Sequence, residues 1–440
     1  MVMSELHLRV FRDKSELVLP DGTSEVFLEG SMSQSAKVRS QNITRELAND
    51  YLAKQIIHCR DRASEIDFLQ LKQTHIDILK KLVDSITSEV GRALVGLTIM
   101  QLCIKAIEPT QSIRLHKGST SRNTFSWRDG ISMRSLDKQY ITPTLRQYDL
   151  LRLNADGFMM TRSLAENYPY SPVYKANIRG ARLEWLSLVE AIEANEIPAE
   201  LGLHYLLSQL LNQAKAFKEL ALQTRKNLNN LLNITENLNQ EFLTEIILKH
   251  INSSDYAARI MEIAMHSLMQ AMQECQIFPE GALKPLSQMR SANKKHGNIG
   301  DIEILEARQI IESWDAKYGK AYLRDEIEEL ADKLESHPTV ALAGVTSVEP
   351  ERREEIISRC QEIKDEFGIY LEILTFRDWI KKQFSRSTAE DVVEEQELAR
   401  AWITAYTESL AQIRPDIAPI DEPCYQWLKT LKEILEELDV

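Results

Sequence analysis

The feature of this sequence that most restricts its fold is an alternation of strand-like and helix-like segments between residues 299 and 384. Around 299–305, acidic and aliphatic residues alternate at every second position, as in a half-buried strand. Near 322–334 the apolar residues recur at every third or fourth position, as in a helix that packs on a core. The predicted strands are 299–305, 310–317, 340–345 and 370–374, and the predicted helices are 322–334, 351–367 and 377–384. This order predicts an α/β unit.

The rest of the chain is mainly helical in pattern, apart from two strand-like pieces at 6–11 and 25–28 around the turn Pro20-Asp21-Gly22. A leucine-rich stretch at 203–220 favours core packing over a dimer seam, because its heptad repeat is not sustained. We therefore expect a multidomain, mainly α chain. Its expected parts are a mostly helical N-terminal domain at 1–110, a basic domain at 111–182, a helical connector at 183–250, the α/β domain at 251–385 and an acidic helical tail at 386–440.

The charge of the chain is unevenly distributed. The formal net charge of −13 argues, taken globally, against nucleic acid as a partner. Residues 112–182, however, contain twelve basic and only five acidic side chains, which leaves −20 for the remainder. We call residues 112–182 the basic block and expect it to bind an anion. The alternative is a solvated basic loop region, or a patch that docks on the acidic remainder.

The pattern inside the basic block predicts a winged helix-turn-helix, with a turn between its two helices. Residues 135–137 can cap a short helix, and Thr142-Pro143 can begin a second one. Strand-like pieces at 151–153 and 158–161 then flank a turn at 154–157. In such domains the second helix enters the major groove and basic side chains contact phosphates. The expected DNA-binding residues are Arg134, Thr142, Thr144, Arg146, Gln147, Tyr148, Arg152, Asn154 and Arg162.

A group of charged residues on the first two strands of the α/β unit indicates a catalytic site that binds a metal ion. Asp315 and Lys317 share a strand face, and antiparallel pairing can bring Asp301 beside them. Two carboxylates with an open coordination position suit Mg²⁺, which keeps water and accepts a substrate phosphate. The ammonium can orient the attacking water and offset charge in the transition state. The alternative is a surface ion pair of little energetic value.

This arrangement resembles the PD-(D/E)xK nuclease superfamily and, within it, the type II restriction endonucleases. Asp301 matches the first acid, although Gly300 stands where the name has proline, and Asp315-Ala316-Lys317 matches the (D/E)-x-K element. Glu262 matches an acid that many members carry on the preceding helix. The resemblance covers residues 251–385. It implies a restriction-endonuclease-like core, with a mixed central sheet flanked by helices. In this core Asp301 and Asp315 would bind the metal, and Lys317 and Glu262 would complete the catalytic set.

Lys294 and Lys295 lie just before Asp301 and are expected to bind phosphates of DNA that enters the site. The alternative is a solvated loop. The five cysteines form no Cys-x-x-Cys pair, which favours a reducing compartment. The most apolar stretch, 93–104, is too short to span a bilayer, and the first residues lack the apolar run of a signal peptide. We therefore expect a cytoplasmic protein with no membrane partner.

The leading hypothesis is a Mg²⁺-dependent, site-specific endonuclease that acts on double-stranded DNA. A homodimer is expected for a palindromic target, because protein symmetry mirrors site symmetry. A DNA methyltransferase is the expected genetic partner in a restriction–modification system. Two other hypotheses stay open: a non-catalytic DNA-binding protein on the same scaffold, and a helical subunit of a larger assembly.

Overall fold

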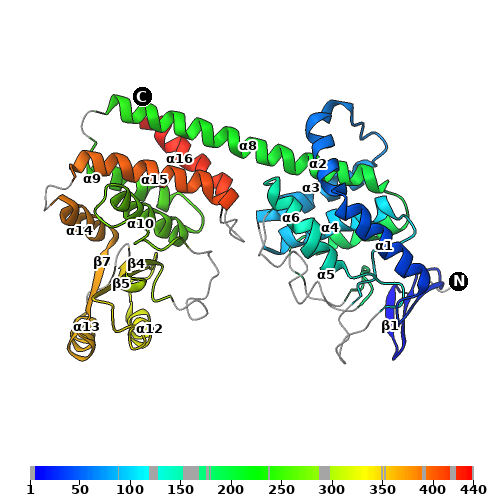
Figure 1. Ribbon diagram of the computed structural model, residues 1–440, viewed down its shortest axis with the longest axis horizontal. Coiled ribbons are helices and arrows are strands. Elements are labelled where there is room, and N and C mark those ends of the chain that lie inside the picture. The colour runs from blue at the N-terminus through cyan, green and yellow to red at the C-terminus, as the bar shows by residue number, and fades with distance from the viewer. Residues whose placement is uncertain are drawn as a thin grey trace. The chain divides into compact units, whose positions relative to one another are not determined.

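The computed structural model is mostly helical, with one four-stranded mixed sheet and one three-stranded antiparallel sheet (Figure 1). The chain divides into two compact units, Met1–Ala216 and Phe217–Val440. The residues described are 5–87, 89–117, 127–151, 168–174, 178, 180–235, 238–286, 298–347, 350, 353–388, 393–416 and 423–438.

The small sheet belongs to the first unit and consists of β1 (His7–Val10), β2 (Lys14–Val18) and β3 (Ser24–Leu28) in the order β1-β2-β3. Two strands were expected here, and β2 lies between them in the sheet. Its inner face is covered by a small core in which Leu17 and Phe27 pack with Leu115 and Trp127.

The main core of the first unit is helical. It is built by α1 (Gln34–Ala48), α2 (Tyr51–Asp61), α3 (Gln73–Asp84), α4 (Glu89–Ile107), α7 (Arg182–Glu193) and the first half of α8 (Ala199–Ile234). The apolar stretch 93–104 is the buried part of α4. Within the described ranges, no helix is both long enough and apolar enough to cross a membrane. The leucines of the stretch 203–220 on α8 pack into the hydrophobic cores, as expected.

The second helix expected in the basic block begins at Thr142 as predicted, but the expected turn before it is not formed. Residues 133–147 form one continuous helical run, made of α5 (Met133–Leu136), the π-helical segment η3 (Asp137–Ile141) and α6 (Thr142–Gln147). The π-helical segment directly precedes Pro143, which lacks an N–H and whose ring would clash with the carbonyl four residues earlier in a regular α-helix. The wider π turn accommodates the proline. The expected hairpin lies almost entirely outside the described residues.

The mixed sheet of the second unit agrees closely with the pattern in the sequence. Its strands β4 (Ile302–Glu306), β5 (Gln309–Ala316), β6 (Leu342–Ser347) and β7 (Tyr370–Thr375) lie in the order β4-β5-β6-β7. β4 and β5 are antiparallel, whereas β5, β6 and β7 run parallel. Ala307 and Arg308 have positive φ values of 49° and 69°, so two residues suffice to reverse the chain between β4 and β5.

Helices cover both faces of this sheet (Figure 1). The side that carries Ile302 and Trp314 packs against α10 (Ala257–Glu274) and α14 (Phe376–Thr388). The side that carries Ala343 and Val345 packs against α12 (Arg324–Leu334) and α13 (Glu354–Phe367). The expected helices at 322–334, 351–367 and 377–384 are therefore present with shifted ends.

The first of these layers continues into α9 (Gln240–Asn252), α15 (Glu395–Asp416) and α16 (Cys424–Leu438), which share one core with α10 and α14. Trp402 donates from Nε1 to the carbonyl of Ala264 on α10 at 3.0 Å. His250 bridges the Tyr406 hydroxyl at 2.6 Å and the Trp427 carbonyl at 2.8 Å. The boundaries expected at 250/251 and 385/386 fall inside this core, because amphipathic helices far apart in sequence bury their apolar faces together.

Candidate functional site

The three acidic and basic residues expected to form a site come together at one end of β4 and β5. The pairing of Ile302 with Trp314 places Asp301 and Asp315 at the next position of the two strands. The Asp301 N–H donates to the Trp314 carbonyl at 3.0 Å, and the Asp301 Oδ2 accepts from the Ala316 N–H at 3.0 Å. Lys317 Nζ lies 2.7 Å from Asp315 Oδ2. The sequence pattern therefore predicted this convergence correctly.

The two carboxyl groups are strongly coupled. Burial, followed by the negative charge of Asp301, raises the pKa of Asp315 from 3.8 to about 7. Burial, followed by the charge of Glu262, also raises the pKa of Asp301. Repulsion between two buried carboxylates favours a singly protonated pair, with one proton shared by the two groups, when no cation is bound.

Lys317 supplies the positive charge of the site. Burial lowers the pKa of its ammonium, but the nearby carboxylates of Asp315 and Asp301 outweigh that effect and raise the pKa above its ordinary value. Its backbone N–H donates to the Thr346 carbonyl at 2.8 Å, which fixes the chain just after β5. The side chain is therefore a charged ammonium held against two carboxyl groups.

Glu262 is brought near the site by α10, which packs on β4 and β5. It is buried, with 9% of its surface exposed, and accepts from Arg259 Nη1 at 2.5 Å. Its charge contributes to the raised pKa of Asp301. Sequence reasoning identified Glu262 but missed Arg259, which lies three residues away on the same helix face.

The residues present fit a hard divalent cation. Asp315 Oδ1 is buried and has no hydrogen-bond partner. Two adjacent carboxyl groups with raised pKa values favour a bound cation, because the cation replaces the shared proton and removes the repulsion. Oxygen donors suit Mg²⁺, which keeps several waters. Within the described ranges, no three His, Cys, Asp or Glu side chains are grouped to hold a metal alone.

Two further buried carboxylates of β4 and β5 were given no role by the sequence, and one of them, Glu303, lies beside the site. Glu303, two residues after Asp301, pairs with Lys284 at 2.6 Å. Glu312, on the opposite face of the sheet, accepts from Arg386 at 2.9 Å and from Trp314 Nε1 at 2.7 Å. The strand alternation could have placed both residues on their faces, but their partners come from distant segments.

Trp314 forms the floor behind the site on the face that packs against α10 and α14. A Cβ atom at Gly344 would lie 2.3 Å from Trp314 Cζ3 and 2.8 Å from the Glu372 carbonyl oxygen. Only glycine therefore fits beside this indole on β6. The tryptophan next to the acidic residues is thus a packing residue of the core, with its N–H satisfied by Glu312.

The expected DNA-binding residues are divided by the structure of the first unit. Arg134 and Gln147 are exposed, and Thr144, Arg146 and Tyr148 are half-buried. Thr142 is buried at 2% exposure, and its hydroxyl donates to Asp137 Oδ1 at 2.7 Å. The expectation that Thr142 contacts DNA is therefore wrong, because its hydroxyl is buried and bonded to Asp137 of the π-helical segment. The remaining expected contacts lie outside the described residues; these are Arg152, Asn154, Arg162, Lys294 and Lys295.

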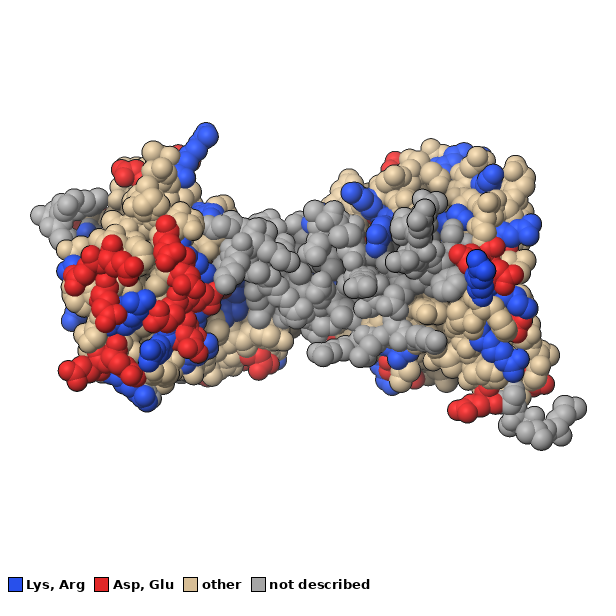
Figure 2. Space-filling model, turned by 90° about the horizontal axis from the view of Figure 1, so that it is seen from below, with Lys and Arg blue, Asp and Glu red and all other residues tan. Residues whose placement is uncertain are grey.

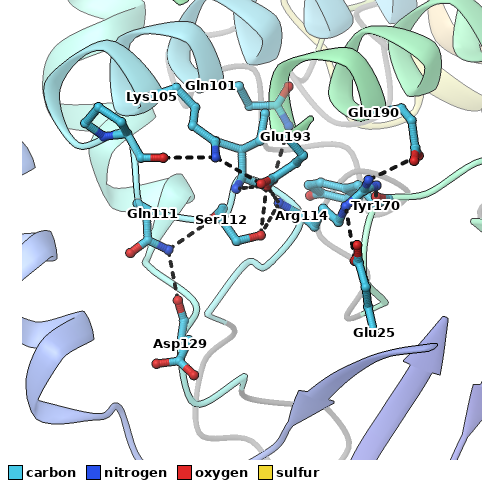
Figure 3. Close-up of polar contacts among 12 residues, drawn as sticks. Glu25, Gln101, Lys105, Gln111, Ser112, Arg114, Asp129, Tyr170, Glu190 and Glu193 are labelled. Atoms are coloured by element: carbon cyan, nitrogen blue, oxygen red, sulfur yellow. Dashed lines mark hydrogen bonds and ion pairs between the residues drawn. The ribbon is translucent and has the colours of Figure 1, made fainter. Parts of the chain in front are cut away.

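Part of the basic block is used inside the fold (Figure 3). Arg114 is 4% exposed, donates to the Tyr170 carbonyl at 2.7 Å and pairs with Glu190 at 3.1 Å. Glu193 on α7 accepts from the N–H groups of Ile113 at 2.5 Å and Arg114 at 3.2 Å, and pairs with Lys105 at 3.0 Å. This end of the block is therefore anchored to the helical core.

The surface of the second unit carries acids over its sheet-covering helices (Figure 2). The exposed acids of α12 and α13 are Asp325, Glu329, Asp332, Glu354, Glu355, Glu362, Asp365 and Glu366. Such a face repels a polyanion. A nucleic acid that reached Asp301 would therefore have to approach from a direction other than these two helices.

No protein-family model and no curated protein sequence matches the chain. A proposal of function therefore rests on the sequence and on the geometry of the site.

Proposed function

We propose that this protein is a Mg²⁺-dependent endonuclease that hydrolyses phosphodiester bonds in double-stranded DNA at specific sites. The observation that carries the proposal is the convergence of Asp301, Asp315 and Lys317, with the buried Asp315 Oδ1 lacking a partner. Two carboxylates and one ammonium at the same end of two paired strands agree with the resemblance to the PD-(D/E)xK nucleases. It also suits a reaction in which charge develops on a phosphate.

Each residue has a role that follows from its position. Asp301 and Asp315 would hold Mg²⁺, which when bound stabilises charge on the phosphate oxygens. The Ala316 N–H fixes one oxygen of Asp301, so this carboxylate is already oriented. Lys317 would orient the attacking water and offset negative charge, since its ammonium is fixed against Asp315. Glu262 would add negative charge close to Asp301, and Arg259 holds one of its oxygens.

Site specificity is assigned to the basic block. Arg134 and Gln147 are exposed side chains on or beside one helical run, and amides and guanidinium groups are the donors that read base edges. The acidic helices α12 and α13 would limit non-specific binding to DNA. A homodimer, and a methyltransferase that protects the host DNA, belong to the same proposal.

The decisive experiment incubates the protein with long plasmid or phage DNA and Mg²⁺ and sequences the ends produced. We expect discrete cuts. Asp301→Ala and Lys317→Ala should each lower the cleavage rate by about 10²–10³-fold or more, while both variants still shift DNA in a gel. Cleavage that persists in both variants would contradict the assigned residues. Sequence-selective shifts without products, under any divalent cation, would support the non-catalytic alternative.

A further inference from the structure

Glu303 is a second buried carboxylate close to the proposed metal ligands. It lies two residues after Asp301 on β4 and is 2% exposed. Its Oε1 accepts from the Ile299 N–H at 2.5 Å, and its Oε2 pairs with Lys284 Nζ at 2.6 Å. Lys284 Nζ also donates to Asn298 Oδ1 at 2.7 Å. Both oxygens of Glu303 are therefore engaged, and its buried charge is paired.

These contacts close a ring around the turn that precedes Asp301. The segment that carries Lys284 lies along the free edge of β4, where the Lys284 N–H donates to the Glu303 carbonyl at 3.0 Å. The Ile299 carbonyl accepts from Lys333 Nζ on α12 at 3.2 Å. The Asp301 N–H is bonded to β5. The turn 298–301 is thus held from three sides, and the Glu303 carboxylate is the group that holds its buried N–H.

We propose that Glu303 is a positioning residue that holds the Asp301 carboxylate opposite Asp315, with Lys284 as its necessary partner. This inference rests on the proposed function of the site. If Glu303 loses its charge, the Lys284 ammonium is left without its anion and the Ile299 N–H has a weaker acceptor. The turn then relaxes, and Asp301 no longer meets a cation with fixed geometry. Partners of metal ligands commonly tune metal affinity in this way.

The chain offers a matched control in Glu312. This glutamate is 4% exposed and is paired with one cation, Arg386, and with one further donor, Trp314 Nε1. It lies on the opposite face of the sheet, and its contacts hold β5 to α14 instead of the turn before Asp301. Glu303→Gln and Glu312→Gln therefore make the same chemical change at two similarly buried positions, with only Glu303 beside the site.

The experiment measures binding of Mn²⁺ alone, a spectroscopic substitute for Mg²⁺ at oxygen sites, by electron paramagnetic resonance. Glu303→Gln should weaken Mn²⁺ binding by about 10–100-fold, whereas Glu312→Gln should leave it at the wild-type value. Lys284→Met should reproduce the loss, and it serves as the test if Glu303→Gln does not fold. The double variant should lose less than the two single losses combined, because the residues act as a pair.

The outcomes separate this inference from the function on which it rests. Equal weakening in the Glu303 and Glu312 variants would reduce Glu303 to a general stabilising residue and overturn the inference. Wild-type affinity in Glu303→Gln, together with lost binding in Asp301→Asn, would overturn the inference while supporting the metal site. Absence of Mn²⁺ binding by the wild-type protein would overturn the proposed function and this inference with it.

Discussion

The acidic site of the second unit and the basic block of the first were both predicted from charge and spacing. The structure agrees with the predicted arrangement of the acidic site and differs from that of the basic block. Asp301, Asp315 and Lys317 converge as the strand pattern requires. In the basic block, Arg114 is buried in the core and the expected turn between helices is replaced by a π segment. Residues on paired strands are fixed by a two-residue period and a short turn, whereas charges on irregular segments have no such constraint.

The largest expected effect tests whether Arg114 belongs to the fold or to a DNA surface. Arg114→Met leaves the Tyr170 carbonyl without its buried donor and removes the partner of the half-exposed Glu190, and it should lower the free energy of unfolding by about 1–3 kcal/mol. Lys138→Met, at an exposed position of the same block, should change it by less than about 0.5 kcal/mol. Urea denaturation measures both. If Arg114→Met kept wild-type stability and lost DNA affinity, the contrast between the two regions would fail.

An intermediate effect concerns the coupled acids. The pKa of Asp315 is about 7 in the fold against an ordinary 3.8, so between these values the folded state binds a proton that the unfolded chain has released. The stability of the metal-free protein should therefore fall as pH rises through this range. Asp315→Asn should remove this dependence and raise the Tm by about 2–4 °C above pH 7.

Thermal unfolding of both proteins in a chelator, at pH values of about 5 and about 8, measures this difference. Saturating Mg²⁺ should restore stability to the wild-type protein at the higher pH but not to the variant, because the cation replaces the shared proton. An identical pH profile for the two proteins would show that Asp315 is not the group that titrates.

The smallest expected effect sharpens the account of the basic block. Arg134→Ala should reduce the slope of log affinity against log salt by about one, since one phosphate contact is lost. Arg324→Ala, an exposed arginine on the acidic helix α12, should leave the slope unchanged. Gln147→Ala should alter sequence preference with little change in slope. Filter binding at several salt concentrations measures all three, and equal slopes would remove Arg134 from the interface.

The sequence by itself determined the order of strands and helices in the second unit and the convergence of its acids. Alternation at every second position and the two-residue turn at Ala307 and Arg308 leave one register that buries the apolar residues. The pairing of β4 with β5 has one irregularity, at Ile311, where the register between the two strands shifts. Glu262 was also correctly placed, because a helix that precedes a strand packs on the same sheet.

Tertiary structure alone decided which distant segments meet. Lys284 reaches Glu303 because its segment lies along the free edge of β4, a pairing that no local pattern encodes. α9, α15 and α16 share a core with α10 because each must bury an apolar face, and amphipathicity does not specify the partner. Arg114 is buried because Glu190 and the Tyr170 carbonyl compensate its charge. Local periodicity fixes which face of an element is apolar, and packing then decides which residues cover it.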